Sequence, residues 1–157
     1  MSNYERVVVL SIDALKAPHL PIHGYERDTA PYISSLAERG QWFRNCYSMS
    51  SHTRESMPAA LTGQFPNKVL GKQYRLTAPT VAEAVPVESA MFHSNPFLSR
   101  AYDFDQGFDT FDDDLWVGRN RLLTLARRLL DKFRNRHYVR ANKINERSLS
   151  WVDEQSD

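Results

Sequence analysis

A run of six residues near the start of the chain constrains the fold more than any other feature. Residues 7–12 read VVVLSI, an almost continuous apolar stretch rich in β-branched side chains, and Asp13 ends it. Such a run is typical of a strand that is buried on both faces, as in the parallel sheet of an α/β protein. Ligands of open α/β sheets gather beyond the carboxyl ends of the strands. Asp13 is therefore either a loop residue that ends the strand or a hard oxygen ligand for a divalent metal.

Helix and strand signals alternate along the chain that follows. The segment Asp28–Pro31 supplies a polar cap with proline in the first helical turn, and Gly40 is placed to end that helix. Trp42–Tyr47 and Glu88–Phe92 are predicted to be further strands, and Thr80 is predicted to cap a short helix. We therefore expect an α/β fold with a mainly parallel sheet flanked by helices on both faces.

A further helix is predicted over Glu55–Leu61, after a polar loop and before the helix-ending pair Thr62 and Gly63. Thr53 lies at its N-terminus, where a hydroxyl can cap free backbone N–H groups. The same end of a helix gathers N–H donors and dipole charge that favour an oxyanion or a phosphate. A hydroxyl at that position can therefore also act as a nucleophile, and both readings stay open.

The residues on either side of Thr53 form a longer pattern. It comprises Phe43, Asn45 and Tyr47 before the helix, then Leu61, Thr62, Gly63, Phe65 and Pro66 at and after its end. This pattern resembles the nucleophile segment of the alkaline phosphatase/sulfatase superfamily, in which F-x-N-A-Y leads into C/S/T-x-P-S-R/H-x-x-L-L-T-G. Counting back from Gly63 places Thr53 on the nucleophile position and Ser56 on the motif serine. The resemblance implies an alkaline-phosphatase-like fold and chemistry on sulfate or phosphate esters.

The chain also departs from that pattern. Glu55 and Met57 stand where sulfatases carry Pro and Arg, and Cys46 stands in place of an Ala. A threonine cannot be converted to formylglycine, as the Cys or Ser of true sulfatases is. The resemblance therefore points to relatives that use an unmodified Thr, namely phosphodiesterases, phosphomutases and phosphoglycerol transferases.

The same resemblance implies roles for individual residues. Asp13 falls on the first metal-ligand position, and Thr53 would be both the nucleophile and a ligand of a divalent ion, which could be Zn, Mn or Ca. Ala14 replaces the second Asp of many sulfatases, which suits a transition-metal site better than a calcium site. Arg54 would neutralise charge that develops on the reacting group. The alternative for Arg54 is a solvated residue of the first helical turn.

Beyond the third predicted strand, the sulfate-binding lysine segment of sulfatases is replaced by a loop that contains His93 and Asn95. These two residues are expected either to contact the substrate or to make hydrogen bonds that stabilise the loop. Gly107–Asp109 matches a G-F-D motif of the family. The carboxylates between Asp103 and Asp114 lack the spacing of an EF-hand and are predicted to form a solvated acidic loop.

Composition excludes several other classes of function. A net charge of +1 provides no argument for a nucleic-acid partner, and a single cysteine, Cys46, excludes an intrachain disulfide. The first residues lack the pattern of a secretory signal, and no apolar run approaches the ~20 residues of a membrane span, so we expect a cytoplasmic protein. Residues 119–136 form a basic amphipathic pattern without a nucleic-acid motif and are predicted to be a surface helix. Another helix is predicted over residues 141–157.

These observations lead to one principal prediction and one alternative. Residues 1–157 are expected to be the N-terminal part of a single alkaline-phosphatase-like domain, apparently truncated, because the remaining metal ligands of the family come from later strands. The predicted function is that of a metal-dependent hydrolase or transferase with Thr53 as nucleophile. Its substrate would be a sulfate or phosphate ester of a small molecule, a glycan or a lipid. The alternative is a non-catalytic binding module or a degenerate fragment of such an enzyme.

Overall fold

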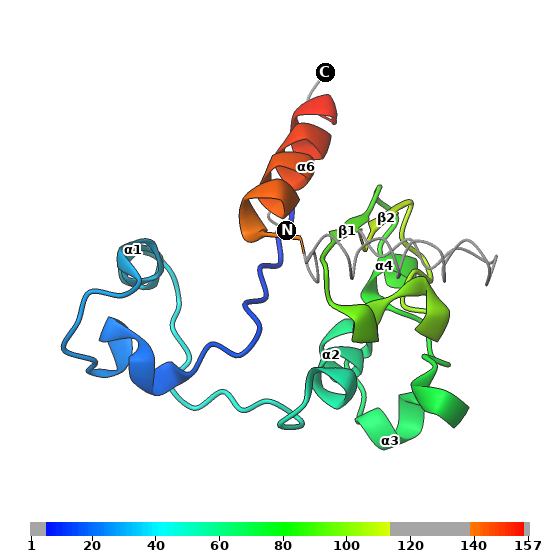
Figure 1. The fold of residues 1–157 in the computed structure, drawn as a ribbon, viewed down its shortest axis with the longest axis horizontal. Coiled ribbons are helices and arrows are strands. Elements are labelled where there is room, and N and C mark those ends of the chain that lie inside the picture. Colours follow the sequence, from blue (N-terminus) through cyan, green and yellow to red (C-terminus); the bar gives the residue numbers. More distant parts are fainter. Residues whose placement is uncertain (1–5, 114–138, 156–157) are drawn as a thin grey trace, which may run out of the picture. The chain divides into compact units, whose positions relative to one another are not determined.

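The computed structural model describes residues 6–113 and 139–155 (Figure 1). The chain divides into two compact units, with the boundary between Ser48 and Met49. Unit 1 contains the apolar run and Asp13, whereas unit 2 contains Thr53 and the remaining candidate residues. Each unit is described by itself.

Unit 1 contains two short 3-10 helices, η1 (Ala17–His19) and η2 (Pro21–His23), and the helix α1 (Pro31–Arg39). The predicted helix after Asp28 is confirmed, with Pro31 in its first turn and the Gly40 amide bonded to the Leu36 carbonyl at its end. Its N-cap is Ala30, which provides no side-chain cap. The expected polar cap is absent because an alanine occupies the N-cap position, and the Thr29 hydroxyl donates to the His19 carbonyl at 2.6 Å.

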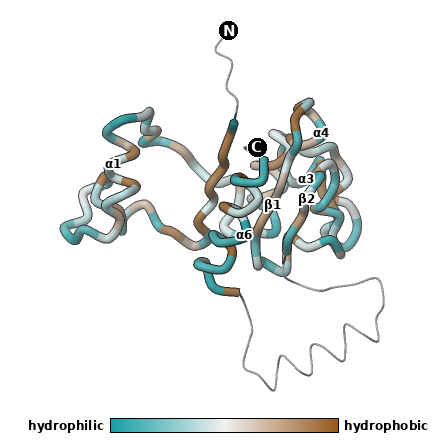
Figure 2. Tube along the Cα trace, turned by 90° about the horizontal axis from the view of Figure 1, so that it is seen from above, coloured by the Kyte–Doolittle hydropathy of each residue, from teal (hydrophilic) through white to brown (hydrophobic). Residues whose placement is uncertain are grey.

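The two strands predicted in unit 1 are wrong. Residues 7–12 and 42–47 form no strand, and the side chains from Val7 to Leu10 are 77% to 87% exposed. Figure 2 shows this segment as a hydrophobic stretch of the tube next to the N-terminus. The physical reason is that a strand needs a neighbouring strand for its backbone N–H and C=O groups. Apolar composition favours the extended conformation but does not supply that neighbour.

Unit 2 contains most of the regular structure. Its α-helices are α2 (Thr53–Thr62), α3 (Pro66–Val69), α4 (Val81–Ala84) and α6 (Ala141–Glu154). Its 3-10 helices are η3 (Lys72–Tyr74), η4 (Pro96–Leu98) and η5 (Arg100–Tyr102), and its strands are β1 (Ala90–Phe92) and β2 (Thr110–Asp112). The predicted helix ending at Gly63, the short helix after Thr80, the strand at residues 88–92 and the helix from residue 141 are all confirmed. The helix predicted over residues 119–136 lies outside the described residues.

The two described strands pair in parallel, with Ala90 opposite Thr110 and Phe92 opposite Asp112. The prediction of a parallel sheet is thus confirmed on a small scale. The predicted acidic loop is present as turns over residues 103–109, but the prediction is wrong for the residues that follow, because β2 runs through them and Phe111 and Asp113 are buried. The carboxylates are tolerated because partners neutralise them, for example Arg100 at 3.1 Å from Asp105.

A cluster of buried apolar side chains holds unit 2 together. Its fully or nearly fully buried members are Val69, Leu76, Leu98, Phe104 and Phe111, drawn from α3, η4, β2 and the loops between elements. Met57 and Leu61 of α2 pack against this cluster. Since both lie on the inward stripe of α2, the core determines how that helix is rotated about its axis.

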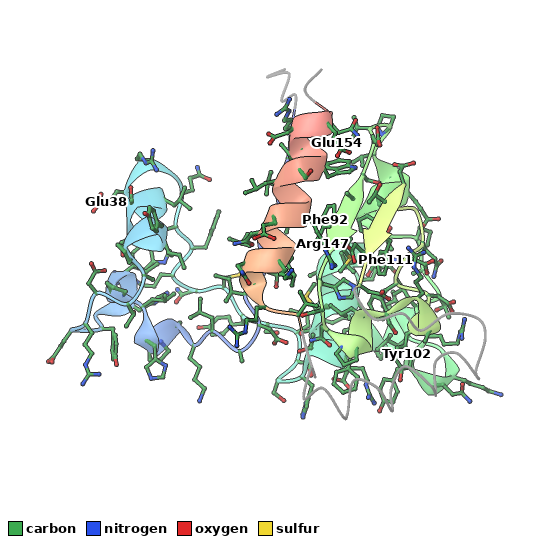
Figure 3. All side chains as sticks on the ribbon, turned by 45° about the horizontal axis from the view of Figure 1, so that its top comes forward. Glu38, Phe92, Tyr102, Phe111, Arg147 and Glu154 are labelled. Atoms are coloured by element: carbon green, nitrogen blue, oxygen red, sulfur yellow. The ribbon has the colours of Figure 1, made fainter. Side chains whose placement is uncertain are left out.

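Helix α6 lies alongside β1 (Figure 3). The Trp151 ring lies 6.3 Å from the Phe92 ring, measured between centroids. The Arg147 guanidinium donates to the Asp112 carboxylate at 3.1 Å. This ion pair is partly exposed, so solvent screens it. Among the described residues, no helix has both the length and the apolar character needed to cross a membrane.

The G-F-D segment has a structural role in unit 2. Gly107 adopts a left-handed backbone conformation with φ +79°, and a Cβ placed there would lie 2.9 Å from the Glu83 backbone nitrogen. Asp109 accepts a hydrogen bond from the Ser89 backbone at 2.9 Å, just before β1. The Thr80 hydroxyl donates to the Gln106 carbonyl at 2.9 Å. These contacts join the turn before β2 to α4 and β1.

We predict that Gly107→Ala destabilises the protein more than Gly63→Ala does. Both positions have positive φ, which costs a side chain roughly 1–2 kcal/mol. Only Gly107 also lacks space for a Cβ, since nothing lies within 4 Å of such an atom at Gly63. We expect the clash to add about 1–3 kcal/mol. Denaturant unfolding of both variants measures the difference in their free energies of unfolding. Equal losses of stability would contradict the close approach of Gly107 to Glu83.

Candidate functional site

Thr53 is the first residue of α2, so the helix begins two residues before its predicted start at Glu55. The N-cap position falls on His52, which has an extended backbone and makes no side-chain cap. Thr53 therefore does not occupy the capping position, and its partly buried side chain stands in the first helical turn. The Glu55 N–H of this first turn bonds to the His52 carbonyl at 3.2 Å, and the helix dipole adds positive charge at this end of the helix. This environment suits an anion.

The loop before α2 is held by its own polar groups. The Ser50 hydroxyl accepts a hydrogen bond from the His52 backbone at 3.3 Å. The Ser51 hydroxyl lies 3.1 Å from Nδ1 of the His52 ring. These short-range bonds set the direction from which the chain enters the helix at Thr53.

Arg54 lies between two aromatic rings. Its guanidinium carbon is 4.5 Å from the centroid of the Tyr74 ring and 4.4 Å from that of Phe97. A cation over an aromatic face is stabilised by the ring quadrupole, by about 0.5–2 kcal/mol depending on desolvation. Arg54 is thus a partly buried contact between α2, η3 and η4 rather than a fully solvated first-turn residue. Its proposed action on a reacting group stays a prediction.

Beside α2 there is an open hollow with a volume of about 540 Å³. It is lined by Met49, Ser50, Glu55, Pro66, Asn67, Leu70, Gly71, Gln73 and Tyr74. The Glu55 oxygen Oε2 is buried and has no hydrogen-bond partner among the described residues. Sequence reasoning noted Glu55 only as a departure from the family motif. The carboxylate in the place of the motif proline is the feature of the sequence that could have identified Glu55 as a residue of interest.

His93 and Asn95 follow β1 directly, at the carboxyl end of the strand. The Asn95 backbone N–H donates to Nδ1 of His93 at 3.1 Å, and the Asn95 side chain accepts from the Phe97 backbone at 3.0 Å. The loop-stabilising hydrogen bonds expected of this pair are therefore present. Contact with a substrate stays a prediction for both residues.

The surroundings of the His93 ring favour its neutral form. The ring makes an edge contact with the Phe111 ring at 5.2 Å, and its Nε2 is buried without a hydrogen-bond partner in the described part of the chain. Burial lowers the pKa of His93, and the nearby carboxylates of Asp113 and Asp112 oppose this effect without cancelling it. Because Nδ1 accepts a hydrogen bond, the neutral ring carries its proton on Nε2.

The two candidate metal ligands belong to different units. Asp13 lies in an exposed turn of unit 1, whereas Thr53 belongs to unit 2. Within residues 6–113 and 139–155, no three His, Cys, Asp or Glu side chains are grouped so that they could hold a metal ion. The described residues therefore provide candidate ligands rather than a complete site.

Comparison with known families identifies the class of protein to which these elements belong. The sulfatase family model matches residues 5–152, which is nearly the whole chain. The chain therefore belongs to the sulfatase family, within the alkaline phosphatase/sulfatase superfamily, as its sequence motif predicts. Separate comparisons with curated proteins and with solved structures found no match.

Family membership supports several of the broader predictions. Sulfatases are hydrolases that act on sulfate esters and generally depend on a divalent metal ion. The family implies an alkaline-phosphatase-like α/β fold, with which the parallel pair β1–β2 and its helices agree.

We predict that protonation of His93 destabilises the folded protein. With its pKa lowered in the folded state, His93 takes up a proton there at a lower pH than in the unfolded chain. The unfolded state then binds more protons below about pH 6.5, so the free energy of unfolding falls as the pH falls, until the folded pKa is passed. Urea unfolding between about pH 7.5 and about pH 5 measures this loss.

The matched variant is His93→Asn, whose side-chain oxygen is as many bonds from Cβ as Nδ1 is and can still accept from the Asn95 backbone. The expected result is a smaller loss of stability on acidification than in the unsubstituted protein. An identical pH dependence in both would show that His93 is not held neutral by burial.

Proposed function

We propose that this protein is a sulfatase-like hydrolase or transferase of sulfate or phosphate esters, with the hydroxyl of Thr53 as its nucleophile. The observation that carries the proposal is the position of Thr53. It occupies the nucleophile position of the family motif and is also the first residue of α2, where helix geometry favours an anion. The family match runs across both compact units, which supports treating them as parts of one domain.

The proposed reaction is an in-line displacement. The Thr53 oxygen forms a bond to the sulfur or phosphorus atom while the bond from that atom to the ester oxygen breaks, and the alcohol departs with a proton. Water then attacks the same atom and releases sulfate or phosphate, which regenerates the Thr53 hydroxyl. An acceptor alcohol in the place of water would make the protein a transferase.

Other residues are proposed to support this chemistry. Arg54, held on the same helical turn by its two aromatic neighbours, would stabilise negative charge on the reacting group. His93 and Asn95 follow the carboxyl end of a parallel strand, which is where α/β proteins bind ligands, and would contact the substrate. Asp13 and Thr53 are proposed as two ligands of a divalent ion, Zn²⁺, Mn²⁺ or Ca²⁺, although the described residues offer fewer ligands than such an ion needs.

We predict that Thr53→Ala abolishes turnover without unfolding the protein. The hydroxyl is the bond-forming atom, so its loss should lower the rate of hydrolysis of an aryl sulfate or aryl phosphate on the order of 10³-fold or more. Far-UV circular dichroism and thermal unfolding check that the fold is intact. In the unsubstituted protein, mass spectrometry after rapid quenching of the reaction should show one sulfuryl or phosphoryl group on Thr53.

The matched control is Thr62→Ala, at the other end of the same helix, where the hydroxyl bonds to the Pro58 carbonyl at 2.7 Å. This variant should keep its activity. Turnover by Thr53→Ala at the unsubstituted rate would refute the assignment of the nucleophile. A protein that binds the ester but does not hydrolyse it with any divalent metal ion added would instead support the alternative of a binding module.

A further inference from the structure

The guanidinium of Arg54 is stabilised by aromatic rings rather than by a carboxylate. Among the described residues it makes no ion pair and no hydrogen bond, and its carbon lies 4.5 Å and 4.4 Å from the centroids of the Tyr74 and Phe97 rings. Ring faces stabilise a positive charge without neutralising it, and they do not use its N–H groups. Arg54 therefore keeps both the charge and the donors that an anion requires.

The backbone that carries the Tyr74 ring has a costly conformation. Gln73 and Tyr74 both have φ of 60°, as in a type I′ turn, whose two central positions favour glycine and asparagine. A left-handed conformation at a tyrosine persists only where the surrounding structure enforces it. Here the Gly71 N–H donates to the Arg75 carbonyl at 2.8 Å and closes the turn. The closed turn therefore fixes the place of the Tyr74 ring.

The loop after β1 places the Phe97 ring. The Phe97 N–H donates to the Asn95 side chain at 3.0 Å, and the next residue, Leu98, is buried in the apolar cluster. Phe97 is 41% exposed and Tyr74 is 44% exposed, and Arg54 itself is partly exposed. An anion in solution can therefore reach the guanidinium, although the two rings that contact it are fixed.

We propose that Tyr74 and Phe97 are positioning residues, which hold Arg54 so that its N–H groups bind two oxygens of the sulfate or phosphate group of the substrate. That the anion belongs to an ester substrate rests on the proposed function. Consecutive residues of a helix point about 100° apart, so Arg54 and Thr53 share one anion only when the arginine side chain is held in one direction. Arginine has a large rotamer entropy, and the rings reduce it before the anion binds.

The first test measures anion binding without turnover. The full chain is titrated with inorganic sulfate and, separately, with inorganic phosphate, and binding is followed by NMR. Arg54→Gln removes the cation and should weaken binding at least about tenfold. The double variant Tyr74→Leu/Phe97→Leu keeps the cation but removes both rings, and it should also weaken binding about tenfold.

Two matched variants separate positioning from a general loss of structure, and thermal unfolding checks that every variant is folded. Tyr74→Phe/Phe97→Tyr keeps a ring at both positions and should bind sulfate as the unsubstituted protein does. Tyr32→Leu removes a ring on α1 that is 87% exposed, and it should leave binding unchanged. Binding that survives Arg54→Gln, or that survives the loss of both rings, would overturn the inference.

A measurement on the unsubstituted protein does not depend on the folding of any variant. The side-chain protons of Arg54 should be shifted upfield by ring currents, because the guanidinium lies over both rings. Sulfate should then change the Nε–H signal of Arg54 but not that of Arg39, whose Nε donates to the Ser35 carbonyl at 3.2 Å. Unshifted Arg54 protons, or an Arg54 signal that sulfate leaves unchanged, would refute the proposal.

Hydrolysis assays distinguish a failure of this inference from a failure of the proposed function. If sulfate binding depends on Arg54 and on both rings but no aryl sulfate or aryl phosphate is hydrolysed, the anion site stands and the proposed catalysis fails. If an aryl ester is hydrolysed and the leucine double variant keeps both kcat and KM, the catalysis stands and the positioning role is refuted. If both proposals hold, the leucine double variant should lower kcat/KM about tenfold.

Discussion

The turn before β2 is the constraint on which the described part of unit 2 depends most. Gly107 approaches the Glu83 backbone so closely that no side chain fits, and the Glu83 carboxylate accepts a hydrogen bond from the Thr80 backbone at 2.9 Å. Asp109 then joins the same turn to the start of β1. The bond between Ser89 and Asp109 fixes the register of the two strands, because a shift of one residue would break it. His93, at the end of β1, owes its burial against β2 to that register.

The buried apolar cluster also positions the helix that carries the candidate nucleophile. Met57 and Leu61 anchor α2 on the buried cluster, which leaves the first turn of the helix at the edge of the packed region. There Arg54 is stacked between two rings from separate elements, while Glu55 lines the hollow. One helical turn thus combines a hydroxyl, a stacked cation and an under-satisfied carboxylate. This combination differs from the Pro and Arg of true sulfatases.

Local signals predicted the helices well and the strands poorly. Helices end where a residue such as Gly63 can take a left-handed conformation, and their hydrogen bonds join residues four apart, so a short window of sequence contains the needed information. Strand formation depends on a distant partner. The apolar run at residues 7–12 therefore suggested a strand that is not formed. The strand at residues 110–112 was not predicted, because it lies within an acidic stretch. In β2 a single buried residue, Phe111, and neutralised carboxylates were enough.

The sequence by itself determined the family and the ends of most helices, since these depend on residue types at short and regular spacing. Only the tertiary structure decided the surroundings of the side chains. It placed Arg54 against two rings, left the Glu55 oxygen Oε2 without a hydrogen-bond partner among the described residues, and buried His93 so that its pKa falls. Each of these properties arises from contacts between residues far apart in the chain. Burial and charge at a site are set by such contacts, and motif spacing does not encode them.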